Sequence, residues 1–135
     1  LPFSICGKRN EEKTMKNGFL KVAVTTPDLR VADCEYNKNQ MVEKVKKMAG
    51  EKVSLVCFPE FSLTGYTCGD LFLHDTLVEG AKDALAAYCE ETKSYEIVSV
   101  VGLPLDHNGK LYNVAAVIYG GKILGFVPKS YLPLQ

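Results

Sequence analysis

Two amphipathic stretches alternate with apolar, β-branched runs along this chain, and that order limits the folds it can adopt. The runs 19–26, 53–58 and 97–103 are rich in valine, leucine and isoleucine, which favour β-strands. The stretches 33–49 and 75–92 place apolar residues at near-helical spacing among charged ones, so each predicts a surface helix. Strand, helix, strand, helix, strand is the order of an α/β fold with a parallel sheet.

Local signals predict where these elements end. Asp33 is a potential N-cap for the first helix, and Gly50 is its potential stop. Two further strands, 111–119 and 122–127, flank the pair Gly120-Gly121, which is typical of a two-residue hairpin turn. The sheet is therefore predicted to finish with an antiparallel hairpin.

Charge and composition exclude several classes of function. The 16 basic and 16 acidic side chains balance, which leaves no electrostatic case for binding nucleic acid or a membrane surface. No apolar run approaches the roughly twenty residues of a transmembrane helix, and the apolar segment 1–6 is too short for a secretory signal. We expect a cytoplasmic protein in which 1–16 form a disordered leader and 17–135 the folded part.

The five cysteines and two histidines form no metal or disulfide pattern. Their number and spacing fit neither zinc sites nor a disulfide framework, so reduced thiols are expected. Cys57 lies in a predicted strand and Cys89 in a predicted helix, and both are interpreted as small core residues. His74 and His107 have no partner ligand at metal-like spacing, so no metal site is expected.

Two of the predicted strands lead into side chains suited to catalysis. The run 53–58 is followed by the carboxylate of Glu60, and the strand 122–127 is followed closely by Lys129. Sites in α/β proteins form beyond the carboxyl ends of parallel strands. Glu60 falls at such a position, and a carboxylate and a lysine that both follow strands can flank one site; the alternative is a solvated carboxylate and a surface lysine.

Three blocks of sequence resemble the nitrilase, or carbon–nitrogen hydrolase, superfamily. They are the stretch 57–72 around Glu60, the segments Gly102-Leu103-Pro104 and Tyr112-Asn113-Val114-Ala115, and the stretch 125–133 around Lys129. More narrowly, the first two blocks resemble the glutamine-hydrolysing domains of the glutamine-dependent NAD synthetase family. The resemblance covers about residues 15–133, and the order and spacing of the blocks make it specific.

This resemblance implies both a fold and a reaction. The fold is a four-layer α-β-β-α sandwich of which this chain would form the first half, so one apolar sheet face would lack its second sheet. The reaction is hydrolysis of an amide by a glutamate, a lysine and a cysteine. Glu60 matches the general base and Lys129 the oxyanion donor. The cysteine is expected beyond Gln135, because Cys68 does not match the nucleophile motif.

The sequence also suggests roles for two loop residues, and the resemblance implies cofactors and an oligomeric state. Tyr66 is the candidate for contact with substrate, with packing on the core as an equal alternative. Asp70 is expected to cap the helix that follows it, with ordering of its own loop as the alternative. The amide step is expected to need no cofactor, whereas the resemblance implies ATP and Mg²⁺ for a separate synthetase domain, as well as a homo-oligomer.

Three functions are therefore open. The first is the glutamine amidohydrolase part of a glutamine-dependent NAD synthetase, with 17–135 as the N-terminal portion of that domain and glutamine as substrate. The second is another carbon–nitrogen hydrolase of the amidase or nitrilase type. The third, from a different class, is a catalytically inactive fragment that pairs with full-length chains as an interaction module, because the cysteine motif is absent from this chain.

Overall fold

Both amphipathic stretches form helices close to their predicted ends. In the computed structural model, α1 spans Cys34–Gly50 and α2 spans Asp75–Thr92. The Asp33 carboxylate caps α1, because it accepts a hydrogen bond of 3.0 Å from a backbone N–H of the first turn. The helix ends at Gly50, as predicted, although Gly50 is itself its last helical residue, and the left-handed residue that redirects the chain is Lys52, with φ of 61°.

The structure describes residues 18–132, whose strands form a single sheet in the order β1-β2-β3-β4-β5. The strands are Val22–Val24, Leu55–Cys57, Val98–His107, Lys110–Tyr119 and Lys122–Pro128. The first three run parallel and the last two antiparallel. The leader predicted for 1–16 lies outside the described residues. β1 and β2 are shorter than predicted because regular pairing between them covers only three positions.

Two tight turns join the antiparallel strands. Asn108 and Gly109 link β3 to β4 with φ values of 54° and 72°, and Gly120 and Gly121 link β4 to β5 with 58° and 77°. Positive φ at both central positions matches the twist of a hairpin, and Asn-Gly and Gly-Gly adopt it readily. The hairpin predicted at Gly120-Gly121 is confirmed.

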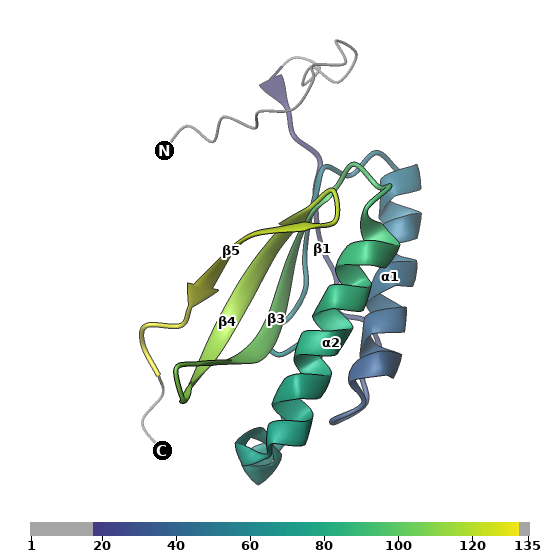
Figure 1. Ribbon diagram of the computed structural model, residues 1–135. Coiled ribbons are helices and arrows are strands. Elements are labelled where there is room, and N and C mark those ends of the chain that lie inside the picture. Colours follow the sequence, from purple (N-terminus) through teal and green to yellow (C-terminus); the bar gives the residue numbers. More distant parts are fainter. Residues whose placement is uncertain (1–17, 133–135) are drawn as a thin grey trace.

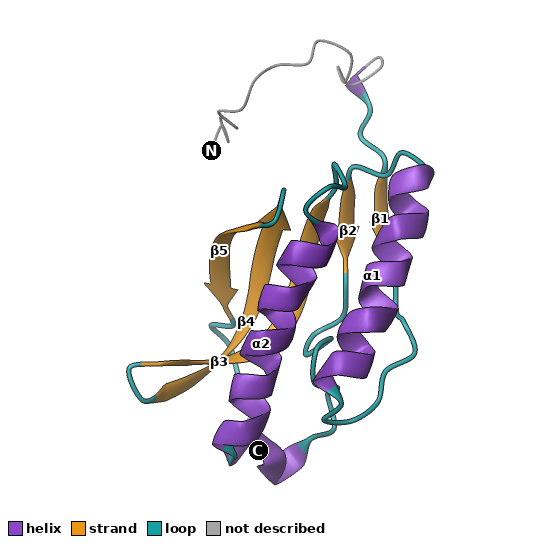
Figure 2. Ribbon diagram, turned by 45° about the vertical axis from the view of Figure 1, so that its right-hand side comes forward, coloured by secondary structure: helices purple, strands orange, loops and turns teal. Residues whose placement is uncertain are grey.

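The core lies between the sheet and the two helices, which pack side by side on one sheet face (Figures 1 and 2). The apolar face predicted for α2 is buried, and it comprises Leu77, Ala81, Ala84, Leu85 and Tyr88. The hydroxyl of Tyr88 donates a hydrogen bond of 2.7 Å to the Ser99 hydroxyl, so this buried polar group has a partner. Among residues 18–132, no helix is both long and apolar enough to cross a membrane.

No described segment covers the opposite face of the sheet (Figure 2), and apolar side chains are exposed on it. Val22, Val24 and Val127 are 57%, 84% and 60% exposed, and the whole of β5 is exposed. Strand alternation explains this, because side chains that do not face the helices point to the other side of the sheet. The same alternation leaves Cys57 half-buried on the uncovered face, so its predicted place in the core is wrong.

Candidate active site

The loop that follows β2 lies along β3 and carries Glu60. The backbone N–H of Phe58 donates to the Val100 carbonyl at 3.0 Å, and that of Leu63 donates to the Gly102 carbonyl at 3.1 Å. The Gly102 N–H in turn donates to the Ser62 hydroxyl at 3.0 Å. These bonds attach the chain to β3 on both sides of Glu60, so the loop is held at the carboxyl end of the parallel strands.

Gly102 permits this close approach. A Cβ at Gly102 would lie 2.5 Å from the backbone nitrogen of Phe61 and 2.7 Å from the carbonyl oxygen of Pro59, so any larger residue would displace the loop. Phe61 has φ of 53°, which is rare for a bulky side chain. Its ring packs against that of Phe72 with centroids 4.6 Å apart, and this packing helps to hold the unusual backbone.

Asn37 ties the same loop to α1, and sequence analysis did not single it out. Its side chain is fully buried and donates to the carbonyls of Leu63 at 3.0 Å and Arg30 at 2.8 Å. It also accepts a hydrogen bond from the Arg30 N–H at 2.7 Å. The only signal was an asparagine four residues before Met41 on the apolar stripe of the helix, which suggests a satisfied buried amide.

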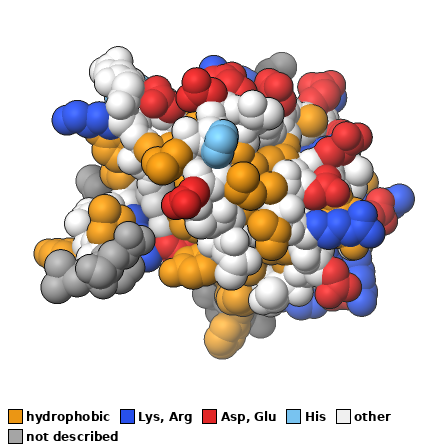
Figure 3. All heavy atoms as spheres, turned by 90° about the horizontal axis from the view of Figure 1, so that it is seen from below, with side chains coloured by type: hydrophobic (Ala, Val, Ile, Leu, Met, Phe, Trp, Pro, Cys, Tyr) orange, Lys and Arg blue, Asp and Glu red, His pale blue; other side chains and the backbone are white. Residues whose placement is uncertain are grey.

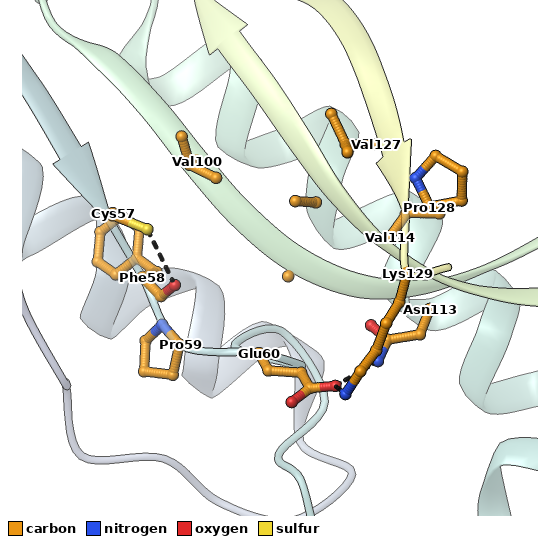
Figure 4. Close-up of a pocket in the computed structure, with 12 residues that line it drawn as sticks. Cys57, Phe58, Pro59, Glu60, Val100, Asn113, Val114, Val127, Pro128 and Lys129 are labelled. Carbon is orange, nitrogen blue, oxygen red and sulfur yellow. Dashed lines mark hydrogen bonds and ion pairs between the residues drawn. The ribbon is translucent and has the colours of Figure 1, made fainter. Parts of the chain in front are cut away.

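Lys129 reaches Glu60 from the end of β5, 69 positions away along the chain. Its backbone N–H donates to the Asn113 carbonyl at 2.8 Å, which extends the ladder between β4 and β5 past Pro128. Its Nζ lies 2.7 Å from Glu60 Oε1. The side-chain amide of Asn113 donates to the same oxygen, and Figure 4 shows the three side chains converging. The predicted juxtaposition of Glu60 and Lys129 is present in this geometry.

The two charges stabilise each other. The hydrogen bond from Lys129 lowers the pKa of Glu60, partial burial opposes this, and the Asn113 amide lowers it further. Glu60 raises the pKa of Lys129, and Tyr66 adds a smaller electrostatic effect in the same direction. The side chains of Lys129 and Glu60 are 35% and 37% exposed, so solvent screens the pair and a substrate can reach it.

An open pocket of about 330 Å³ adjoins this pair on the uncovered sheet face. Its walls are mostly apolar, and its polar end is formed by Glu60, Asn113 and Lys129 (Figure 4). A second pocket, of about 210 Å³, is lined by aromatic and aliphatic side chains and shares Asn113 and Lys129 with the first. Apolar walls with a few convergent polar groups are typical of small-molecule sites.

Figure 3 shows this end of the molecule from below, with hydrophobic side chains across its middle and most acidic and basic side chains towards its edges. Tyr66 is 60% exposed and its ring packs 6.1 Å from that of Phe61. Tyr66 lines neither of the two pockets beside the pair.

Three of the four described cysteines are buried in the core. Burial raises the pKa of the Cys34 thiol to about 11 and also raises that of Cys89, so both are protonated at neutral pH. Cys89 is thus the core residue that its sequence position predicted. Cys68 is also buried, and its thiol donates to the carbonyls of Thr64 at 3.1 Å and Gly65 at 3.3 Å. None of these thiols is placed to act as a nucleophile.

Cys57 is the described cysteine that lines the first pocket. Its sulfur contacts the carbonyl oxygen of Phe58 at 3.7 Å. Figure 4 shows this sulfur at the opposite end of the pocket from the Glu60 carboxylate and Lys129. Within residues 18–132, Cys57 therefore shares the cavity with the pair but is not bonded to it.

Asp70 does not cap α2, so that prediction is wrong. A short 3₁₀ helix, η2, occupies Gly69–Leu73 and includes Asp70, and the N-cap of α2 is His74, which makes no side-chain capping bond. The extra helical turn puts Asp70 too early in the chain to reach the first turn of α2. Across the described part of the chain, no three His, Cys, Asp or Glu side chains group closely enough to hold a metal ion.

The fold and the Glu60–Lys129 pair together point to a hydrolase with a nitrilase-like sheet. Residues 21–133 match the family described as carbon–nitrogen hydrolase. This chain therefore belongs to the carbon–nitrogen hydrolase family, as its sequence motifs predicted.

Within this family, the chain is similar to glutamine-dependent NAD(+) synthetases. The glutamine-dependent NAD(+) synthetase of Mycobacterium tuberculosis is 37% identical over 118 residues, which are 87% of this chain and 17% of that protein. The structure of a glutamine-dependent NAD(+) synthetase from Cytophaga hutchinsonii has a TM-score of 0.79 at 26% identity, covering 84% of this chain and 19% of the other. This chain thus spans about a fifth of the length of the synthetases that it matches.

An amidase gives the same fold at lower identity. A cysteine-to-serine mutant of the Nesterenkonia AN1 amidase, from the nitrilase superfamily, has a TM-score of 0.72 at 18% identity and covers 86% of this chain and 45% of the other. These matches confirm the predicted fold class, which is α/β and corresponds to the first half of a nitrilase-like four-layer sandwich.

Proposed function

We propose that this chain supplies the general base and the oxyanion donor of a glutamine amidohydrolase. The observation that carries the proposal is the ion pair between Glu60 and Lys129, 2.7 Å apart at the polar end of a pocket. Both side chains come from the ends of strands, and both remain accessible. The similarity to glutamine-dependent NAD(+) synthetases supports glutamine as the substrate.

In the proposed reaction a cysteine thiol loses its proton to Glu60 and its sulfur attacks the amide carbon of glutamine. The carbonyl oxygen becomes an oxyanion, which the Lys129 ammonium stabilises. Glu60 returns the proton to the leaving nitrogen, so the C–N bond breaks and ammonia departs. Water then attacks the thioester with Glu60 again as base, which releases glutamate and regenerates the thiol.

The nucleophile in this proposal is a cysteine that follows Gln135 in the whole protein. Its support is that the thiols of Cys34, Cys68 and Cys89 are buried and that the Cys57 sulfur lies away from Glu60. Lys129 lowers the pKa of Glu60, so the free carboxylate carries its charge but is a weak base. Substrate that covers the pair would desolvate the carboxylate and increase its basicity.

We further propose that the whole protein is a cytoplasmic, homo-oligomeric glutamine-dependent NAD synthetase. The ammonia would pass to a separate synthetase domain that uses ATP and Mg²⁺, while the amidase step itself needs no cofactor. The support is the 87% of this chain that aligns with such a synthetase. An amidase or nitrilase that acts on short aliphatic amides is the alternative within the family.

Ammonia release from glutamine and from butyramide, measured with the natural-length protein that carries this chain, tests the proposal. We expect hydrolysis of glutamine, and a loss of roughly a hundredfold or more in kcat/KM for Glu60→Gln and for Lys129→Ala. Glu79→Gln and Lys82→Ala are the matched controls, because Glu79 and Lys82 form an exposed pair on α2 with 3.9 Å between N and O. Wild-type rates in the Glu60 and Lys129 variants would refute the proposal, and preference for butyramide would favour the amidase alternative.

The uncovered apolar sheet face favours one second candidate, an inactive fragment that pairs with full-length chains. Val24 and Val127 on that face are 84% and 60% exposed, and surfaces of this kind promote association. Co-expression of the tagged chain with its full-length counterpart, followed by size-exclusion chromatography, tests this candidate. A stable complex would support it, whereas a monomeric chain that elutes alone would eliminate it.

A further inference from the structure

Asn113 contacts both members of the charged pair in different ways. It lies in β4 opposite Pro104 of β3, and it is half-buried. Its side-chain amide donates to Glu60 Oε1, while its backbone carbonyl accepts the N–H of Lys129 at 2.8 Å. It also lines both pockets beside the pair. One residue therefore links the two segments that supply the site.

The two carboxylate oxygens of Glu60 differ in the number of hydrogen bonds that they accept. Lys129 Nζ and Asn113 Nδ2 both donate to Oε1. Among residues 18–132, no donor binds Oε2, which Figure 4 shows turned away from both nitrogens. A carboxylate oxygen that already accepts two strong hydrogen bonds is a poorer proton acceptor than its free neighbour.

We propose that Asn113 is a positioning residue that holds Glu60 with Oε1 bound and Oε2 free, so that Oε2 is the atom that takes the proton from the nucleophile. The inference rests on the proposed function, since it assigns a proton-accepting atom to the base of that reaction. Two donors at separate positions fix the plane of the carboxylate, whereas Lys129 alone would leave it free to rotate.

An amide suits this task better than other polar groups. The carboxylate of Glu60 only accepts hydrogen bonds, so the NH₂ group of Asn113 must face it. The amide carries no charge and does not titrate, so it orients Glu60 without competing with Lys129. The charged group that faces Glu60 is Lys129, at the end of β5, and the titratable Tyr66 acts on Lys129.

Because Asn113 acts through both its side chain and its backbone, a substitution can distinguish an effect on Glu60 from a general effect on folding. A substitution of its side chain removes the bond to Glu60 but keeps the backbone carbonyl that holds Lys129. The ion pair then remains while the second donor is lost. A purely structural residue in β4 would change stability without changing the titration of Glu60.

A titration of Glu60 provides the first test and needs no activity. The chain is labelled with ¹³C-glutamate, the carboxyl signal of Glu60 is assigned with Glu60→Gln, and its midpoint is followed by NMR. We expect a higher midpoint in Asn113→Ala, because a donor to the charged form is lost, and a still higher one in Asn113→Asp, which adds a like charge. Asn39→Asp, at an exposed position on α1, is the matched control and should leave the midpoint unchanged. An unchanged midpoint in Asn113→Ala would overturn the proposal.

The pH dependence of glutamine hydrolysis by the natural-length protein provides the second test. In Asn113→Ala and Asn113→Ser we expect kcat/KM to fall roughly ten- to a hundredfold and its acidic limb to move to higher pH. Having two variants guards against one that does not fold, which thermal melting reports. A uniform fall with an unmoved acidic limb would overturn the positioning role. If the wild type hydrolyses no amide, the proposed function fails, and the NMR titration still decides whether Asn113 orients Glu60.

Discussion

The loop that carries Glu60 is buried against α1 and β3, whereas β5, which leads to Lys129, is exposed along its whole length. Ser62, Leu63 and Thr64 of the loop have no exposed surface. Every residue of β5 is exposed, including Val127 at 60%. The site is therefore assembled from two kinds of segment. The loop that carries Glu60 belongs to the core, whereas β5 is attached to the sheet only through β4.

The loop and β5 thus hold Glu60 and Lys129 through different interactions. Packing and hydrogen bonds to Asn37 and Gly102 fix the loop, and none of these contacts involves the side chain of Glu60. Lys129 is held by a backbone bond to Asn113 and by the ion pair itself. Substitutions in the loop should therefore change stability and activity together, while those in β5 should leave the stability of the chain almost unchanged.

The largest expected difference is between Leu63→Ala and Val127→Ala. Leu63 has no exposed surface, so its truncation leaves a cavity and should lower the free energy of unfolding by about 2–5 kcal/mol. Val127 is mostly exposed, so Val127→Ala should lower the free energy of unfolding by less than about 0.5 kcal/mol. Denaturant unfolding of the two variants measures both values. Equal losses would show that β5 is as much a part of the core as the loop.

A smaller effect is expected from Gly102→Ala. The new Cβ would lie within 3 Å of the backbone of Pro59 and Phe61, so the loop must shift, at a cost of about 1–3 kcal/mol in the free energy of unfolding. Gly125→Ala in β5 is the matched control, because nothing lies within 4 Å of its Cβ position. The displaced loop also carries Glu60, so amide hydrolysis should fall only in the first variant. A Gly102→Ala protein with wild-type stability and activity would contradict the close approach.

The smallest effect is the contribution of the Glu60–Lys129 pair to stability. The lowered pKa of Glu60 means that its contribution is present above the ordinary value of 4.5 and is lost as pH falls through the lower folded value. The raised pKa of Lys129 means that its contribution is present below 10.5 and is lost as pH rises through the higher folded value. The difference in unfolding free energy between wild type and Glu60→Gln should thus be greatest between these limits.

Urea unfolding across that pH range measures this difference, which solvent screening keeps small. Glu79→Gln removes a carboxylate from the exposed pair on α2 and serves as the control for loss of negative charge. A difference between wild type and Glu60→Gln that persists unchanged at low pH would show that the pair does not account for it.

Local signals in the sequence were sufficient for the helices, the glycine hairpin and the succession of strands and helices along the chain. Asp33 caps α1, and the apolar face of α2 is buried as its spacing predicted. These features depend on residues close together in the chain, whose geometry follows from helical and hairpin periodicity. The predictions that failed, the core position of Cys57 and the cap at Asp70, depended instead on which sheet face is covered and on an unforeseen turn of 3₁₀ helix.

The sequence by itself determined that Glu60 and Lys129 follow strands and that the chain resembles carbon–nitrogen hydrolases. The motifs suggested one shared site, but only the tertiary structure decided that these two side chains are in direct contact, that Gly102 admits the loop and that Asn113 binds both of their segments. The physical reason is distance along the chain. Glu60 and Lys129 are separated by 69 positions, and no local propensity or motif spacing specifies a contact between strands that the sheet brings together only when it folds.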